Sequence, residues 1–309
     1  MVRPLVSLLT ALTMTRVAAA DPIEMAAGPE RNKDHTVTKI MRGPFMTSRL
    51  FSMPTADVIG AYMLSLSGDG SLLQQTGLLT SAGVLAIGFG DLAQLEYRHS
   101  AAISITGVNA PLPGVGVQVK IPIPEYANVP VFGVAFRLGV PRTETFGGTD
   151  VIEQVTDLYI VGRWRFTRFD WLTLHGGTRI SSAAISLGGD RDVDKVKKTL
   201  YLPTAGYDIR MNPSARIVGE VALAPQFHWM PGTEEQPSIG YGLLGRLGVR
   251  WAIVPSVIID GSIGYQLEVA NAAPPSGADA VLQWDIRLGA EVFVPWGALA
   301  CRAAGMFCD

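Results

Sequence analysis

The sequence predicts an all-β protein that closes into an antiparallel up-and-down barrel of about twelve membrane-spanning strands. Three observations lead to this fold class. Apolar and polar residues alternate with a period of two from residue 56 to residue 294. The alternating segments are about ten to thirteen residues long, enough for a tilted strand to cross a bilayer. Short and long connections also take turns along the chain, as in a membrane barrel with short turns at one end and longer loops at the other.

The alternation is clearest in "GVGVQVKIPI", residues 114–123, where valines and isoleucines take every second position around Lys120. Similar patterns occur in "LYIVGRWRF" and "YGLLGRLGVRWAIV". The expected strands are 56–67, 79–90, 92–100, 114–123, 130–140, 155–166, 171–181, 199–211, 215–226, 240–253, 257–268 and 281–294.

The connections give a second regularity. Tight links such as "TRFD", "NPS" and "VPS" alternate with longer polar links such as "PRTETFGGTDVIEQ" and "SAAISLGGDRDVDKVKK". We expect the short links to be periplasmic turns and the long ones to be outer loops.

The barrel explains why charges occur inside apolar segments. Lipid cannot hydrogen-bond the backbone, so strands cross a bilayer only when they close into a ring. One set of alternate side chains then faces hydrocarbon and the other faces the lumen, where Lys120 is expected to point. A charge at mid-depth on the lipid side would cost about 2–4 kcal/mol.

This assignment gives a set of candidate lumen residues, in which Asp157 and Asp208 are also expected. The eleven cations, ten of them arginine, face eight carboxylates. They can pair with one another and close the interior, or they can line a water-filled passage with a mild preference for anions. The candidates are Glu96, Arg98, Lys120, Arg137, Arg163, Arg165, Arg179, Arg210, Arg216, Glu220, Arg246, Arg250, Asp260, Glu268, Asp285, Arg287 and Glu291.

Aromatic residues gather near the expected strand ends, where two interfacial girdles would lie. Those near short turns are Phe89, Trp164, Phe166, Trp171, Trp251 and Trp296; those near long loops are Tyr97, Phe227, Trp229 and Tyr241.

The regions outside the barrel are predicted as follows. Residues 1–20 read as an export signal, with Arg3, an apolar core and small residues in "VAAAD". Residues 21–54 are either a periplasmic leader or a segment that inserts into the lumen, and 55–295 form the barrel. Residues 296–309 are a periplasmic tail in which Cys301 and Cys308 are expected to form a local disulfide in an oxidising compartment.

Over about residues 56–294 the chain resembles the transmembrane β-barrels of the Gram-negative outer membrane. The last expected strand contains "RLGAEVFV", in which Arg287, Gly289, Val292 and Val294 follow that family's C-terminal assembly signal. It departs from the pattern because Val294 stands where an aromatic residue is usual and fifteen residues follow it. The resemblance implies an outer-membrane location, lipid as the surroundings and the barrel-assembly machinery as a partner during insertion.

The sequence points away from several function classes. The formal net charge is −2 without a basic block, so no nucleic-acid partner is expected. We find no metal-ligand cluster, no P-loop and no G-x-S-x-G, and therefore expect no metal, no cofactor and no enzyme. His99 and Ser100 are adjacent in one strand and point to opposite faces, which prevents nucleophile activation between them.

Three functions remain as expectations. The first is a passive pore or small-solute transporter with an arginine-rich lumen. The second is a structural barrel, or one that binds a ligand or surface polymer, with a closed, salt-bridged lumen. The third, least favoured, is a lipid hydrolase acting at the barrel rim.

Overall fold

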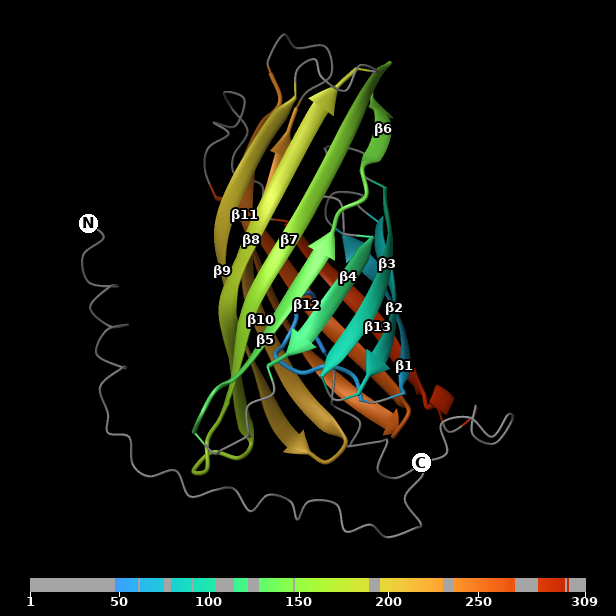
Figure 1. Cartoon of the computed structure of the whole chain (residues 1–309), viewed down its shortest axis with the longest axis vertical. Coiled ribbons are helices and arrows are strands. Elements are labelled where there is room, and N and C mark those ends of the chain that lie inside the picture. The colour runs from blue at the N-terminus through green and yellow to red at the C-terminus, as the bar shows by residue number, and fades with distance from the viewer. Residues whose placement is uncertain are drawn as a thin grey trace, which may run out of the picture.

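A computed structural model describes most of the predicted barrel (Figure 1). The described residues are 48–60, 62–74, 79–90, 92–103, 114–121, 128–146, 148–188, 195–229, 236–269, 283–297 and 299. The strands are β1 (Leu64–Gln74), β2 (Leu79–Phe89), β3 (Ala93–Ile103), β4 (Val115–Lys120), β5 (Val131–Leu138), β6 (Arg142–Phe146), β7 (Thr149–Arg165), β8 (Leu172–Leu187), β9 (Val196–Asn212), β10 (Ala215–His228), β11 (Ser238–Val254), β12 (Val257–Val269) and β13 (Gln283–Val294).

The prediction of a closed antiparallel barrel is confirmed. Every strand pairs antiparallel with its neighbours, and β1 pairs with β13 from Leu64 opposite Val294 to Gln74 opposite Asp285, which closes the ring. Both β5 and β6 pair with β7, at successive levels along it. Strand β6 is therefore the outward continuation of β5, and the wall has the predicted twelve strands around its circumference.

The two faces of the wall differ in the way that a membrane requires. Large apolar side chains such as Leu66, Leu247 and Ile263 are more than half exposed on the outside, while Arg137 and Arg250 are buried on the inside. An apolar exterior around a charged interior is the reverse of a water-soluble protein and suits a barrel surrounded by lipid. Within the described residues, no helix has the length and hydropathy of a membrane span.

The first predicted strand, 56–67, is placed wrongly. Strand β1 begins only at Leu64, and residues 48–60 lie inside the barrel as an irregular segment, blue in the lower half of Figure 1. We call residues 48–60 the lumen segment. Its apolar side chains Leu50, Met53, Val58 and Ile59 are almost completely buried. Alternation in this stretch arose from packing against the lumen wall and not from pairing within it.

Several predicted outer loops are also wrong, because strands occupy much of them. Strands β7, β9 and β11 have seventeen residues each, more than the nine to eleven that a bilayer crossing requires. In Figure 1, β7, β8 and β9 extend well above β4 and β5. The barrel therefore has a strand extension at its outer end.

The outer ends of β10 and β11 fold inward across this extension. Pairing of β9 with β10 stops at Thr204 opposite Ala222, while β10 and β11 stay paired up to His228 opposite Ser238. Phe227 and Ile239, on the face that continues the outer surface of the wall, pack with Val155 and Leu202 on the inner face of β7 and β9. We call this the outer apolar cluster; its buried members are Val151, Val155, Ala183, Ile185, Leu200, Leu202, Phe227 and Ile239.

The inward fold corrects part of the aromatic prediction. Phe227 is only 3% exposed, and Trp229 and Tyr241 pack against the outer apolar cluster instead of forming an interfacial girdle. At the short-turn end, Phe89, Trp171 and Trp251 are exposed on the outside as expected, and Phe169 and Trp171 meet edge to face at 6.0 Å.

Candidate functional site in the barrel lumen

Glu220 on β10 holds the lumen segment through backbone amides. The N–H groups of Phe51, Ser52 and Met53 donate to its carboxylate at 3.0–3.2 Å, and the Ser52 hydroxyl donates at 2.7 Å. Glu220 is 2% exposed. Hydrogen bonds to a charged acceptor are stronger than neutral ones, so this carboxylate fixes the turn at residues 51–53 against the wall.

Uncharged side chains and an arginine fix the rest of the lumen segment. Gln118 on β4 donates to the carbonyls of Thr55 and Asp57 at 2.8 and 2.6 Å, and the Ile59 N–H donates to Gln94 on β3 at 2.9 Å. Arg250 on β11 donates to the Leu50 carbonyl at 2.6 Å. Strands on opposite sides of the barrel thus satisfy the buried backbone of this segment, as buried polar groups require.

Two wall glycines make room for the lumen segment. A Cβ on Gly88 would lie 2.2 Å from the Gly60 carbonyl oxygen, and one on Gly206 would lie 2.3 Å from a Leu50 methyl group. Any larger residue at either position would collide with the segment. The wall and the lumen segment are therefore complementary in shape as well as in hydrogen bonding.

Around the lumen segment, arginines pair with carboxylates on the same strand or on a strand nearby. Glu96 accepts from Arg98 at 3.2 Å and from Arg137 at 2.7 Å. Asp157 accepts two hydrogen bonds from Arg179, both at 2.8 Å. These pairs join β3 to β5 and β7 to β8, and they consume charge that could otherwise face a passing solute.

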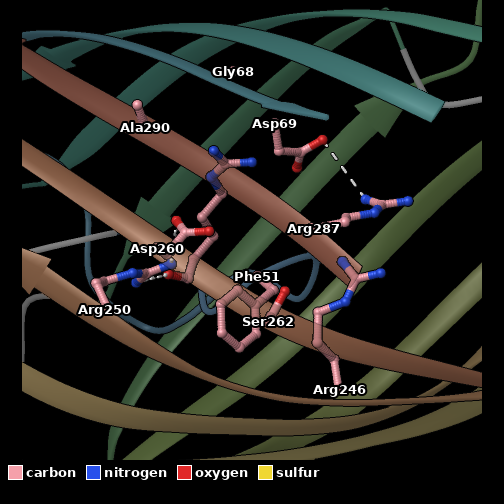
Figure 2. Close-up of a pocket in the computed structure, with 10 residues that line it drawn as sticks. Phe51, Gly68, Asp69, Arg246, Arg250, Asp260, Ser262, Arg287 and Ala290 are labelled. Carbon is pink, nitrogen blue, oxygen red and sulfur yellow. Dashed lines mark hydrogen bonds and ion pairs between the residues drawn. The ribbon is translucent and has the colours of Figure 1, made fainter. Parts of the chain in front are cut away.

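Figure 2 shows a charged pocket between the lumen segment and strands β1 and β11–β13. Arg287 Nη1 lies 3.6 Å from Asp69 Oδ1, and Arg250 Nη2 lies 4.0 Å from Asp260 Oδ2. Arg246 lies beside these pairs and Phe51 below them in the view of Figure 2. The free space is sufficient for about one water molecule.

A second pocket lies beside β7–β10. It is lined by the Asp208 and His175 side chains, by several arginines and by the lumen segment, and it has room for about one or two water molecules. Asp208 accepts from Arg216 at 2.6 Å and lies 3.0 Å from His175 Nε2. Asp57 of the lumen segment pairs with Arg163 and lies 3.9 Å from Lys120.

The remaining predicted lumen residues fall into three groups. Glu291 accepts a hydrogen bond from Ser65 inside the barrel at 2.5 Å. Glu268 and Asp285 occupy inner positions by register, opposite Gly242 and Gly264, although their side chains are outside the described part. Arg165 and Arg210 are exposed near the short-turn end. Arg165 still lines the second pocket, whereas Arg210 forms a 2.5 Å pair with Asp170 at the rim and not within the lumen.

Four charged residues of the interior were missed by sequence reasoning. Asp69 and Glu153 lie on strands where loops were expected, and Arg49 and Asp57 lie on the lumen segment. The interior charges can be counted over the described residues, with Glu268 and Asp285 placed by register. Arg49 is added to the predicted cations and Arg210 is removed, so the number of cations stays at eleven. The three additional carboxylates offset the predicted excess of eleven cations over eight carboxylates. The interior is nearly balanced in charge.

Other predictions concern residues away from the lumen charges. In the proposed assembly signal, a Cβ on Gly289 would lie 2.5 Å from an Asp260 oxygen, so packing against Asp260 also favours glycine at this position. Residues 1–47, Cys301 and Cys308 lie outside the described residues, as do the side chains of His99 and Ser100. No three His, Cys, Asp or Glu side chains of the described part come together as a metal site.

No protein-family model and no curated protein matches the chain. Among solved structures, KdgM porin is 13% identical over 74% of this chain and 98% of its own, with a TM-score of 0.41. The translocator domain of the autotransporter NalP from Neisseria meningitidis is 13% identical over 74% and 86%, with a TM-score of 0.38. Omp33 of Acinetobacter baumannii is 12% identical over 75% and 97%, with a TM-score of 0.34. The closed antiparallel β-barrel of this chain is established by its own strand pairing.

Proposed function

We propose that this protein is an outer-membrane barrel with a closed, salt-bridged lumen that serves as a structural or surface-binding protein. The observation that carries the proposal is the occupation of the lumen by residues 48–60, which hydrogen-bond to β3, β4, β10 and β11. The free space beside this segment is of the size of single water molecules.

Two further features support a closed barrel. Burial of each large apolar side chain of the lumen segment contributes about 1.5–3 kcal/mol, so its departure would be costly. At the other end, the outer apolar cluster gives the strand extension a core of its own. The extension can then serve as a rigid platform above the membrane for contact with a ligand or surface polymer.

Planar-bilayer recording tests the proposal. The purified barrel should give no discrete conductance steps after insertion, and insertion itself should be verified by heat-modifiable migration on a gel. Discrete steps from the unmodified, folded barrel would contradict a closed lumen.

A gated passage for small solutes is the second candidate, and one observation favours it. The lumen segment is a single stretch leading into β1, and Arg246 and Arg250 lie beside it in the pocket of Figure 2. Deletion of residues 48–60 should then produce conductance steps whose ion selectivity changes when Arg246 and Arg250 are both replaced by glutamine. A folded deletion variant that stays silent would eliminate this candidate.

We propose no catalytic role for the protein. A lipase assay tests this directly, and the Ser100→Ala and His175→Ala variants serve as controls. Lipid hydrolysis that disappears in either variant would support the hypothesis of a lipid hydrolase instead.

A further inference from the structure

The second pocket contains a buried histidine with one unused nitrogen. His175 on β8 is 6% exposed, and its Nε2 lies 3.0 Å from Asp208 Oδ2 on β9. Among the described residues, its other ring nitrogen, Nδ1, has no hydrogen-bond partner. The same side chain lines the pocket, so a small molecule there would lie beside the imidazole ring.

The partner of Nε2 determines what Nδ1 can bind. A carboxylate only accepts hydrogen bonds, so the proton of a neutral His175 belongs on Nε2, which leaves a lone pair on Nδ1. That lone pair would repel an anion. A protonated imidazole instead donates from both nitrogens, so an anion in the pocket favours protonation of His175.

The charged groups around His175 favour an anion. Arg163 stands directly opposite it on β7, and the pocket is also lined by Arg165 from β7, Arg216 from β10 and Arg250 from β11. The carboxylates that face the pocket are Asp208 from β9 and Asp57 from the lumen segment. Among the described lining residues, arginines outnumber carboxylates, and a charged imidazole beside Arg163 would add repulsion that a bound anion relieves.

We propose that this pocket binds a small anion of chloride size, and that His175 takes up a proton when the anion binds. The space of about one or two water molecules suits a halide and is too small for a larger solute. Because Thr55 and Asp57 also line the pocket, the anion would join the lumen segment to the wall. This inference goes beyond the proposed function and does not depend on whether the lumen conducts.

Halide binding to the full barrel in detergent tests the proposal. Chloride-free protein is titrated with bromide and followed by the line width of the bromide nuclear resonance at pH 5.5 and pH 8. We expect saturable broadening with affinity about tenfold higher at pH 5.5, since a charge-assisted hydrogen bond is gained there. Crystals grown with bromide should show an anomalous peak within hydrogen-bond distance of His175 Nδ1.

Three variants make the result specific. His175→Phe should abolish the pH dependence and weaken binding about tenfold or more, and Arg165→Gln, at an exposed position, should weaken binding without harming the fold. Arg168→Gln removes the same charge from the turn between β7 and β8, outside the pocket, and should change nothing. Absence of saturable binding, or binding that His175→Phe and Arg165→Gln leave intact, would overturn the proposal.

Discussion

The two halves of the lumen are closed by different chemistry. In the lower half a chain segment without regular structure is held by Glu220, Gln118 and Arg250. In the outer half the β10–β11 hairpin packs through Phe227 and Ile239 onto the inner face of β7–β9. A polar contact accompanies this packing, since Lys198 Nζ donates to the Ile239 carbonyl at 3.0 Å.

Strand β7 shows why the chemistry changes along the wall. Near the short turns its inner face carries the charged Arg163 and Asp157, and the outward Ile160 is exposed on the outside of the wall. Farther out, the inner positions Val155 and Val151 are buried in the outer apolar cluster, and Glu153 between them is a single buried carboxyl group. A wall that extends past a bilayer would meet water on its outside, so its inside can be a largely apolar core.

Phe227→Ala should have the largest effect on stability. Removing a fully buried aromatic side chain costs about 3–5 kcal/mol, and Phe227 is the largest side chain in the outer apolar cluster. Guanidinium unfolding in detergent measures this loss. Phe169→Ala, at an exposed phenylalanine in a turn, is the matched control and should cost far less. Conductance should stay absent in both variants, because the lumen segment still fills the lower half.

Glu220→Gln should weaken the lower closure by about 2 kcal/mol, because a neutral amide replaces a carboxylate that three backbone N–H groups share. The loss should be local, so limited trypsin digestion is the best measurement: cleavage after Arg49 should become faster. Glu291→Gln, which alters the bond with Ser65 instead, serves as control. Equal protection of Arg49 in both variants would show that the Glu220 carboxylate is not needed to retain the segment.

The contrast between the halves also explains what the sequence could reveal. Period-two alternation with apolar residues on the lipid side located the wall strands, because lipid imposes that pattern directly. In "SAAISL" the pattern inverts: Ala183 and Ile185 face inward to the outer apolar cluster, while Ser182 and Ser186 alternate with them. Small and polar outward residues look like loop composition, and the extension of β8 was therefore missed.

The lumen segment was misread for a related reason. In "ADVIGAYM" alternate residues are apolar, yet residues 56–59 are buried inside the barrel and have no strand partner. From a single sequence, a wall strand with one buried face cannot be distinguished from an interior segment that is buried on both faces. The partners of Asp57, Gln94 and Gln118 also depend on contacts between residues far apart in the chain. One signal was available in the sequence. Gly88 and Gly206 lie inside strands, where a glycine often marks the close approach of another chain segment to the wall.

Gly206→Ala tests the fit between the wall and the lumen segment. The added methyl group would meet Leu50 at 2.3 Å and the Gly219 carbonyl oxygen at 2.8 Å, so we expect a loss of about 1–2 kcal/mol from overpacking. A double-mutant cycle with Leu50→Ala measures how much of this loss comes from the segment. Partial recovery in the double variant is expected, since the contact with backbone remains; strictly additive losses would show that Leu50 is not the obstacle.

Arg210→Ala should have the smallest effect and tests where the lumen ends. Its partner Asp170 is 73% exposed and Arg210 itself 48%, so solvent screens the pair and its loss should cost about 0.2–1 kcal/mol. Unfolding in about 1 M salt, where the Debye length falls to about 3 Å, should remove most of that difference. If deletion of residues 48–60 produces an ion-conducting barrel, adding Arg210→Ala should leave its ion selectivity almost unchanged. A large selectivity change would place Arg210 on the ion path, as sequence alternation predicted, and would move the inner boundary of the lumen to the rim.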